Sequence, residues 1–233
     1  WANTNSVIIN AFESMATETR DGLGAVVLVA AGNENSTNIG PPSNYPTTLA
    51  VGSTTSSDQR SSFSNYGVDL SFVAPGSGIF TTDMEGSDGY TGSAYTNFTG
   101  TSAACPVAAG VVGLMASAYP ELTADELSEA LLISCEKVGS YSYTETAGYD
   151  FGTWNNEMGY GRVNAKLALD AAATFVDVCQ GDFNVDGSID AADLLTFLSD
   201  FGCESDCNAA LNGDDQVNGT DLLAFLSLFG NDC

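Results

Sequence analysis

Two spacings of apolar residues in the first part of the chain predict helices and strands. Apolar side chains at Val7, Ile8, Ala11, Phe12 and Met15 follow the 3.6-residue period of a helix, which Ser6 would cap. Residues 25–31 form a continuous apolar run of strand length. Such a run is typical of a strand that is buried on both faces of a parallel sheet. Shorter runs at 48–52 and 70–74 predict two further strands, separated by loops rich in Ser, Asn, Gly and Pro.

Small apolar residues follow Ser102 and predict a buried helix that ends before Pro120. Thr123 and Glu126 then have the spacing of a capping box, in which each side chain accepts a hydrogen bond from the other residue's backbone. They open an amphipathic helix. Helices that alternate with a buried parallel strand predict an α/β fold.

The last part of the chain contains an internal repeat. Residues 182–202 and 210–230 align at an offset of 28, with ten of 21 positions identical. Each copy begins with a loop rich in carboxylates and continues into a short apolar pattern. A duplicated unit this short indicates paired metal-binding loops rather than a solenoid.

Charge divides the chain at the same place. The 233 residues contain 30 acidic and 5 basic side chains and have a net charge of −25. Such a surface repels phosphate backbones and anionic lipids, so neither nucleic acid nor a membrane surface is expected as a partner. Residues 167–233 have no Lys or Arg and contain four of the six cysteines. We therefore expect a domain over 1–172, a linker over 173–180 and a small module over 181–233.

The chain has no histidine, so these residues alone cannot complete a Ser-His-Asp triad or a zinc site with histidine ligands. It also begins at Trp1 rather than at a methionine, and we expect it to be incomplete at its N-terminus. The apolar run at 25–31 is too short to cross a bilayer, and no membrane span is expected.

Ser102 and Asn33 are the candidate catalytic residues. Ser102 lies at the start of a predicted helix, where unpaired N–H groups and the helix dipole favour a developing negative charge. Asn33 follows the predicted strand at its carboxyl end, where open α/β sheets place their ligands. The Asn33 amide and the Ser102 N–H would together stabilise an oxyanion, as acyl transfer requires.

These segments resemble the subtilisin-like serine protease family. Gly100-Thr-Ser-Ala-Ala-Cys-Pro106 is similar to the nucleophile motif, and Ala30-Ala-Gly-Asn33 is similar to the oxyanion motif. The segments between and after them follow the family's order: Tyr45-Pro46, Leu49-Ala-Val-Gly52, Ser62-Phe-Ser64, Val73-Ala-Pro-Gly76 and Gly159-Tyr-Gly-Arg-Val-Asn164. The resemblance covers roughly residues 5–170. It implies a subtilisin-like parallel-sheet domain that is incomplete at its N-terminus.

The same resemblance implies roles for individual residues. Ser102 would be the nucleophile and Asn33 the oxyanion donor, while Ala30, Ala31 and Gly32 would line one wall of the S1 pocket for a polypeptide substrate. The family's Asp and His lie upstream of the Ala-Ala-Gly-Asn strand, in a part of the domain that these residues do not include. The parent protein would be a serine endopeptidase, and this chain alone would be inactive because a serine hydroxyl needs a base.

The first copy of the repeat has the ligand spacing of an EF-hand calcium loop, with Gly187 at position 6 for the sharp turn. Its predicted ligands for Ca²⁺ are Asp182, Asn184, Asp186, the backbone carbonyl of Ser188, Asp190 and Asp193. The second copy retains Asn212, Asp214, Asn218 and Asp221, but Ala210 supplies no ligand at position 1 and Asp215 replaces the glycine. We expect weaker binding there or a purely structural role.

A loop followed by one helix, present twice, resembles a dockerin module, which implies a cohesin-like protein partner. The four cysteines of this module predict two disulfides, with three pairings open, and an oxidising compartment. The protein is therefore expected to be secreted or attached to the cell surface. Cys105 and Cys135 are interpreted as small buried residues rather than reactive thiols.

Two functions remain open at this point. The first is a calcium-using serine endopeptidase that is anchored through its C-terminal module. The alternative is a non-catalytic, calcium-dependent attachment protein whose protease-like domain is inactive. An Asp motif and a His motif upstream of Trp1 would distinguish the first from the second.

Overall fold

The computed structural model describes residues 6–176, 180–184, 186–204, 207, 209–212 and 216–230. The chain forms two compact units, Trp1–Val176 and Asp177–Cys233. We predicted that a linker begins at residue 173, but Phe175 and Val176 pack against the core of the first unit. The first unit therefore extends four residues further than the pattern predicts.

A parallel sheet forms the centre of the first unit. Its strands are β1 (Val27–Ala30), β2 (Thr48–Thr54) and β3 (Phe72–Pro75), in the order β1-β2-β3. Val27 pairs with Thr48 and Val51 pairs with Phe72, so both neighbouring pairs are parallel. The predicted strands at 48–52 and 70–74 are confirmed, as is the parallel α/β fold.

Strand β1 differs from the prediction for residues 25–31. All four of its residues are only half-buried, whereas six of the seven residues of β2 are buried. The reason is that β1 is an edge strand, because no described residue pairs with its outer side. The apolar run therefore forms a strand at the edge of the sheet, and its outer side has no partner in the described part of the chain.

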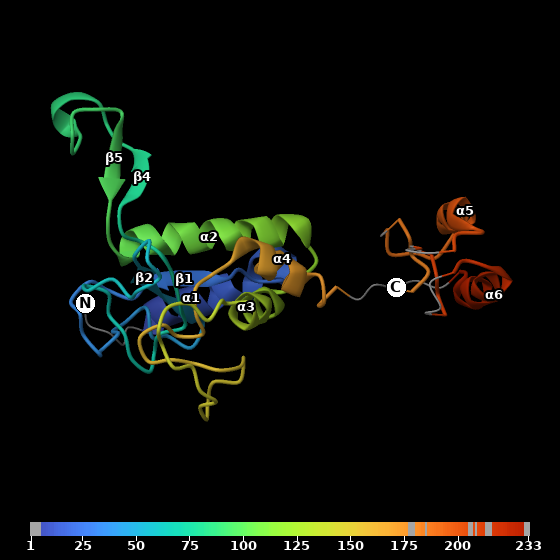
Figure 1. Ribbon diagram of the computed structural model, residues 1–233, viewed down its shortest axis with the longest axis horizontal. Coiled ribbons are helices and arrows are strands. Elements are labelled where there is room, and N and C mark those ends of the chain that lie inside the picture. Colours follow the sequence, from blue (N-terminus) through green and yellow to red (C-terminus); the bar gives the residue numbers. More distant parts are fainter. Residues whose placement is uncertain are drawn as a thin grey trace. The chain divides into compact units, whose positions relative to one another are not determined.

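Helix α2 (Thr101–Ala118) lies along the sheet and is the main helix of the core (Figure 1). Its buried side chains include Ala104, Ala108 and Met115, which pack in one cluster with Val51 and Phe72. The helix is also long and apolar enough to cross a membrane, which the run at 25–31 is not. A core helix passes the same test, and the packing against the sheet accounts for its composition.

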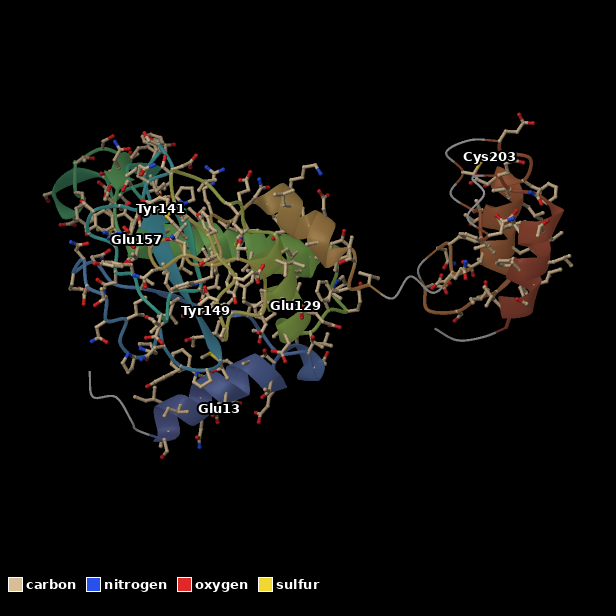
Figure 2. All side chains as sticks on the ribbon, turned by 60° about the horizontal axis from the view of Figure 1, so that its bottom comes forward. Glu13, Glu129, Tyr141, Tyr149, Glu157 and Cys203 are labelled. Carbon is tan, nitrogen blue, oxygen red and sulfur yellow. A yellow bond between two sulfur atoms is a disulfide. The ribbon has the colours of Figure 1, made fainter. Side chains whose placement is uncertain are left out.

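Three further helices complete the first unit: α1 (Ser6–Glu18), α3 (Ala124–Ile133) and α4 (Ala165–Ala172). Short 3₁₀ turns occupy Arg20–Gly22 (η1) and Gly86–Asp88 (η2). Helices α3 and α4 pack in the same core as α2, through Leu127, Leu131 and Ala168. Helix α1 contains no buried residue, and Glu13 points away from the unit on its outer side (Figure 2).

A two-stranded hairpin of β4 (Ile79–Thr82) and β5 (Tyr95–Phe98) stands away from the sheet (Figure 1). The Asp83 carboxylate closes its tip by accepting hydrogen bonds from the backbone N–H of Met84 at 2.9 Å and of Thr91 at 3.0 Å. Desolvation alone would raise the pKa of Asp83, but the bonds from Thr91, Tyr90 and Met84 lower it below its ordinary value. The tip is therefore a defined turn held by one carboxylate.

Arg60 joins several loops at the edge of the sheet. Its guanidinium forms an ion pair with Glu157 at 2.8 Å, and its backbone N–H donates to the Tyr141 hydroxyl at 2.9 Å. Tyr141 and Glu157 are labelled in Figure 2. The guanidinium also lies 4.3 Å from the centre of the Tyr66 ring and donates to the Asn35 side chain at 2.9 Å. Because the Arg60 side chain is only 13% exposed, this ion pair is better shielded from solvent than a surface pair.

The second unit is built on α5 (Ala191–Asp200) and α6 (Gly219–Leu228). Phe197 and Phe225, at equivalent positions of the repeat, are fully buried and stack with ring centres 5.5 Å apart. A disulfide joins Cys203 and Cys207. This pairing is one of those left open above, while Cys179 and Cys233 lie outside the described residues.

The predicted capping box of α3 is present and gives a stability test. Thr123 Oγ1 accepts from the backbone N–H of Glu126 at 3.2 Å, and Glu126 Oε2 accepts from the Thr123 N–H at 2.8 Å. We expect Thr123→Ala to lower the free energy of unfolding by about 1 kcal/mol at pH 7. Urea unfolding followed by tryptophan fluorescence measures this change. Thr17→Ala, on the exposed α1, is the control and should change it by less than about 0.5 kcal/mol.

The effect of Thr123→Ala should also depend on pH. Hydrogen bonds from the Thr123 side chain and backbone hold the pKa of Glu126 below its ordinary value of 4.5. A lowered carboxyl pKa stabilises the fold above the unfolded pKa, and this contribution is lost as pH falls through the folded pKa. The difference between wild type and variant should therefore shrink below about pH 4.5. A difference that stays constant from pH 7 to pH 3 would contradict the role of Glu126.

Candidate active site

Ser102 is exposed at the first turn of α2, in the position that the sequence predicts. The residue before the helix, Gly100, is fixed by a hydrogen bond from its N–H to the carbonyl of Gly76 at 2.9 Å. Within the described residues, no acceptor is recorded for the Ser102 N–H. This N–H group therefore remains available at the positive end of the helix dipole.

Asn33 lies directly beside this helix terminus. Its Oδ1 accepts two hydrogen bonds from Thr101, one from the backbone N–H at 2.9 Å and one from Oγ1 at 3.0 Å. Thr101 is fully buried, so its own position is fixed by packing. With Oδ1 held in this way, the amide nitrogen Nδ2 is the end of the Asn33 side chain that stays free to donate. Asn33 and Ser102 thus come together as two donors of the kind that stabilise an oxyanion.

A cavity of about 670 Å³ opens beside Asn33. Its lining includes Ala30, Ala31 and Gly32, the residues expected to line an S1 pocket, together with Phe12, Pro42 and Tyr45. The lining is mainly apolar, and among the described residues that form it Glu34 alone carries a charge. The cavity has the size and apolar lining of a binding site for a large side chain.

Sequence reasoning missed three residues of this site. Thr101 fixes the Asn33 side chain, Glu34 adds a carboxylate to the cavity, and Asn65 binds the loop that carries Asn33. Thr101 and Glu34 each adjoin a predicted site residue in the sequence, and Asn65 directly follows the Ser62-Phe-Ser64 segment. Their proximity to the site could therefore be predicted from the sequence, but the hydrogen-bond partners of their side chains could not.

The first acidic loop brings three of its predicted ligands together. Carboxylate oxygens of Asp182, Asp186 and Asp193 lie within 4.8 Å of one another. Gly187 has φ +88°, a conformation that side chains rarely adopt, as the sharp turn requires. Three carboxylates at this separation repel one another, and a hard divalent cation such as Ca²⁺ would offset most of their charge. The residues therefore fit a calcium ion.

Other predicted ligands of this loop also stabilise its backbone. Asp190 caps α5 by accepting from the N–H of Ala192 at 2.7 Å. The buried Asp193 accepts from the backbone N–H groups of Phe183 at 2.7 Å and Asp190 at 2.9 Å. Desolvation acts to raise the pKa of Asp193, but these bonds and one from Asn184 lower it. Asn184 bonds to Asp186, and Ser188 donates its N–H to Asp186 at 3.0 Å.

The second acidic loop repeats this backbone pattern. Asp221 is buried and accepts from the N–H groups of Leu211 at 3.0 Å, Asn212 at 3.1 Å and Asn218 at 3.0 Å. Asn218 caps α6 by accepting from Thr220, as Asp190 caps α5. Asp214 and Asp215 lie outside the described residues. The loop therefore keeps the backbone hydrogen bonds of the motif, whereas its first ligand position is occupied by Ala210, which supplies no ligand atom from its side chain.

Comparisons with known proteins identify the family of the chain. The family model of the subtilase family matches residues 2–161. The chain therefore belongs to the subtilase family. Its α/β fold and its parallel sheet are those of that family.

Two curated relatives show how much of the domain is shared. The halolysin-like extracellular serine protease Nep of Natrialba magadii is 36% identical over 146 residues, which is 63% of this chain and 23% of that protein. Subtilisin DY of Bacillus licheniformis is 36% identical over 124 residues, or 52% of this chain and 43% of that protein. The chain thus spans less than half the length of these relatives.

Solved structures support the fold. The serine protease of Aeromonas sobria superposes with a TM-score of 0.62 at 21% identity, covering 72% of this chain and 40% of that one. A protease from Pseudoalteromonas arctica superposes with a TM-score of 0.58 at 29% identity, covering 73% of this chain and 48% of that one. The first of these shows the fold alone.

The two cysteines of the first unit are expected to be unreactive. Cys105 follows Ser102 by one helical turn and is half-buried, and burial raises the pKa of its thiol. Cys135 is buried, which raises the pKa of its thiol to about 12. Because the thiolate is the nucleophile, both should react slowly at neutral pH.

Alkylation with iodoacetamide at pH 8 tests this expectation. We expect Cys135 to remain unmodified for as long as the domain stays folded, and Cys105 to react more slowly than a free cysteine. Peptide mass spectrometry measures both rates, and the chain unfolded in urea is the control that gives full labelling. Rapid labelling of Cys135 in the folded chain would show that this thiol is accessible to solvent, which would contradict its burial in the core.

Proposed function

We propose that this chain is the part of a secreted serine endopeptidase that carries the nucleophile, with Ser102 as that nucleophile. The observation that supports it most is the pair of hydrogen bonds from Thr101 to Asn33 Oδ1, which leave the Asn33 amide nitrogen free beside Ser102. In this mechanism Ser102 Oγ attacks the scissile carbonyl carbon of a polypeptide. The carbonyl oxygen becomes an oxyanion that accepts from Asn33 Nδ2 and the Ser102 N–H.

The general base comes from outside these residues, since the chain has no histidine. We propose that a preceding segment, carrying an Asp and a His, covers the surface that the first unit leaves open. Leu114 is 54% exposed on α2, and a side chain at Gly110 or Gly113 would meet no atom within 4 Å. Ile8 of α1 is exposed as well, and the outer edge of β1 pairs with no strand among the described residues. An apolar surface of this kind is a site for further packing.

The cavity beside Asn33 is proposed as the S1 pocket. Ala30, Ala31 and Gly32 have no bulky side chains, so the cavity accepts a large P1 residue. Its mainly apolar lining favours an aromatic or long aliphatic side chain.

The second unit is proposed as a calcium-dependent, dockerin-like attachment module with a cohesin-like partner. Its duplicated loop and helix, and the three converging carboxylates of the first loop, support this proposal. Apolar side chains at equivalent positions of both helices are exposed: Leu195, Leu198, Phe201, Leu223, Leu226 and Phe229. The name of the Natrialba relative and the Cys203–Cys207 disulfide support an extracellular location. A non-catalytic attachment protein remains the second candidate, because the attachment surface does not depend on Ser102.

The nucleophile is tested on the complete protein encoded by the gene, including whatever precedes Trp1. We expect a fluorophosphonate probe to label it, and Ser102→Ala to abolish both labelling and peptide hydrolysis. Ser57→Ala, an exposed serine in the loop that follows β2, is the matched control and should leave both unchanged. Labelling that persists in Ser102→Ala would exclude Ser102. A complete coding sequence without an upstream Asp and His would favour the attachment protein.

The calcium site is tested on the chain itself by isothermal titration with CaCl₂. We expect a tighter site in the first loop, and Asp182→Ala should raise its Kd at least about tenfold, a loss of about 1.4 kcal/mol or more. Asp170→Ala, an acid paired with Lys166 in the first unit, is the control and should leave the titration unchanged. No heat of binding, or an unchanged Kd in Asp182→Ala, would contradict the site.

A further inference from the structure

Asn65 makes an unusual number of bonds to the segment that carries Asn33. Its side chain is 4% exposed, and its amide donates to the carbonyl of Ala31 at 3.0 Å and to Glu34 Oε2 at 2.8 Å. Its Oδ1 accepts from the backbone N–H of Glu34 at 3.0 Å and of Ser36 at 2.9 Å. Its own backbone N–H donates to the carbonyl of Gly32 at 2.9 Å.

These bonds lie on both sides of Asn33. The carbonyl groups of Ala31 and Gly32 precede it, and the N–H groups of Glu34 and Ser36 follow it. Asn33 itself is exposed and does not contact Asn65 through any recorded bond. This one buried residue therefore fixes the backbone that carries Asn33, and it also lines the cavity beside that backbone.

The contact between Asn65 and this segment is close enough to require a glycine. Gly32 has φ +104°, and a Cβ atom there would lie 2.3 Å from Asn65 Nδ2. Such a separation is far below van der Waals contact. Gly32 thus serves two purposes, since it lines the cavity and also admits the Asn65 amide behind it.

The end of the segment has a second fixed point. Asn35 adopts φ +51°, and its Oδ1 accepts from the Arg60 guanidinium at 2.9 Å. Arg60 also donates to the carbonyl of Ser64, the residue before Asn65, at 2.6 Å. The loop that follows β1 is therefore held by the loop after β2 at several points, of which Asn65 supplies most.

We propose that Asn65 is a positioning residue for the reaction: it holds the loop so that the Asn33 amide points at the developing oxyanion. This inference rests on the proposed function, because it acts through Asn33 as the oxyanion donor. The Thr101 bonds fix the Asn33 side chain, whereas Asn65 fixes the backbone from which that side chain projects. An error of about 1 Å in this backbone would weaken a bond that matters only in the transition state.

The kinetic test is a double-mutant cycle in the complete protein, with a peptide amide that has alanine at P1, so that the substrate does not fill the cavity that Asn65 lines. We expect Asn65→Ala to lower kcat about tenfold, with KM changed less than about twofold, because the lost interaction belongs to the transition state. In an Asn33→Ala background the same substitution should change kcat less than about twofold, since the donor that it positions is gone. An equal loss of kcat in both backgrounds would overturn the inference, because it would mean a general weakening of the fold.

Asn164→Ala is the matched control for stability. Asn164 also accepts two backbone N–H bonds through its side chain, from Lys166 at 2.9 Å and Leu167 at 3.1 Å, but it caps α4. This variant should lose a similar free energy of unfolding and keep kcat. A loss of kcat as large as that of Asn65→Ala would again assign the effect to stability.

Hydrogen exchange in the chain as it stands separates the inference from the proposed function. Asn65→Ala should speed exchange of the Glu34 and Ser36 amides at least about tenfold, while Asn164→Ala should leave both unchanged. Unchanged exchange in Asn65→Ala would overturn the positioning role, whatever the protein catalyses. Hydrolysis that survives Ser102→Ala would instead refute the proposed function and leave the exchange result to decide the role of Asn65.

Discussion

The close approach of α2 to the parallel sheet is the constraint on which the site depends. Alanines at 104 and 108 face the sheet, and small side chains allow the helix to lie near Val51 and Phe72. This contact places the N-terminus of α2 at the carboxyl end of β1. Only then can the buried Thr101 reach Asn33 at 2.9 and 3.0 Å. A looser helix would retain the fold but separate the two donors.

The sequence pattern predicted those elements that depend on local chemistry. The box formed by Thr123 and Glu126 is confirmed, as are the strands predicted at 48–52 and 70–74 and the subtilase family, whereas the hairpin of β4 and β5 was not predicted. The half-buried state of β1 was not predictable from its residues, since an apolar run does not reveal whether a neighbouring strand is present. The first unit also extends past residue 173, because Phe175 and Val176 find partners that are distant in the sequence.

The residues of the site divide in the same way, into those that belong to short sequence motifs and those that act through contacts distant in the sequence. Ser102 and Asn33 belong to motifs of consecutive residues, so their types and order were enough to single them out. Thr101, Glu34 and Asn65 act through contacts between segments that are 29 to 68 residues apart in the chain. The acidic loops were easier to predict, because the hydrogen-bond partners of their side chains lie within ten residues, as with Asp193 and Phe183. Short-range motifs can therefore be predicted from a sequence, whereas the residues that hold them in place are identified only in the folded structure.

The hairpin of β4 and β5 bears on resistance to cleavage by other copies of the same protein. Projecting loop tips are the segments that proteases cut most readily, because they can enter a cleft in extended form. Here the Asp83 carboxylate binds Met84 and Thr91 across eight residues, so the tip would have to open before it could be cut. Molecules at high local concentration, each able to cleave its neighbours, would be selected for tips that stay closed. Under the proposed function, the Asp83 carboxylate would therefore make this exposed hairpin tip more resistant to autolysis.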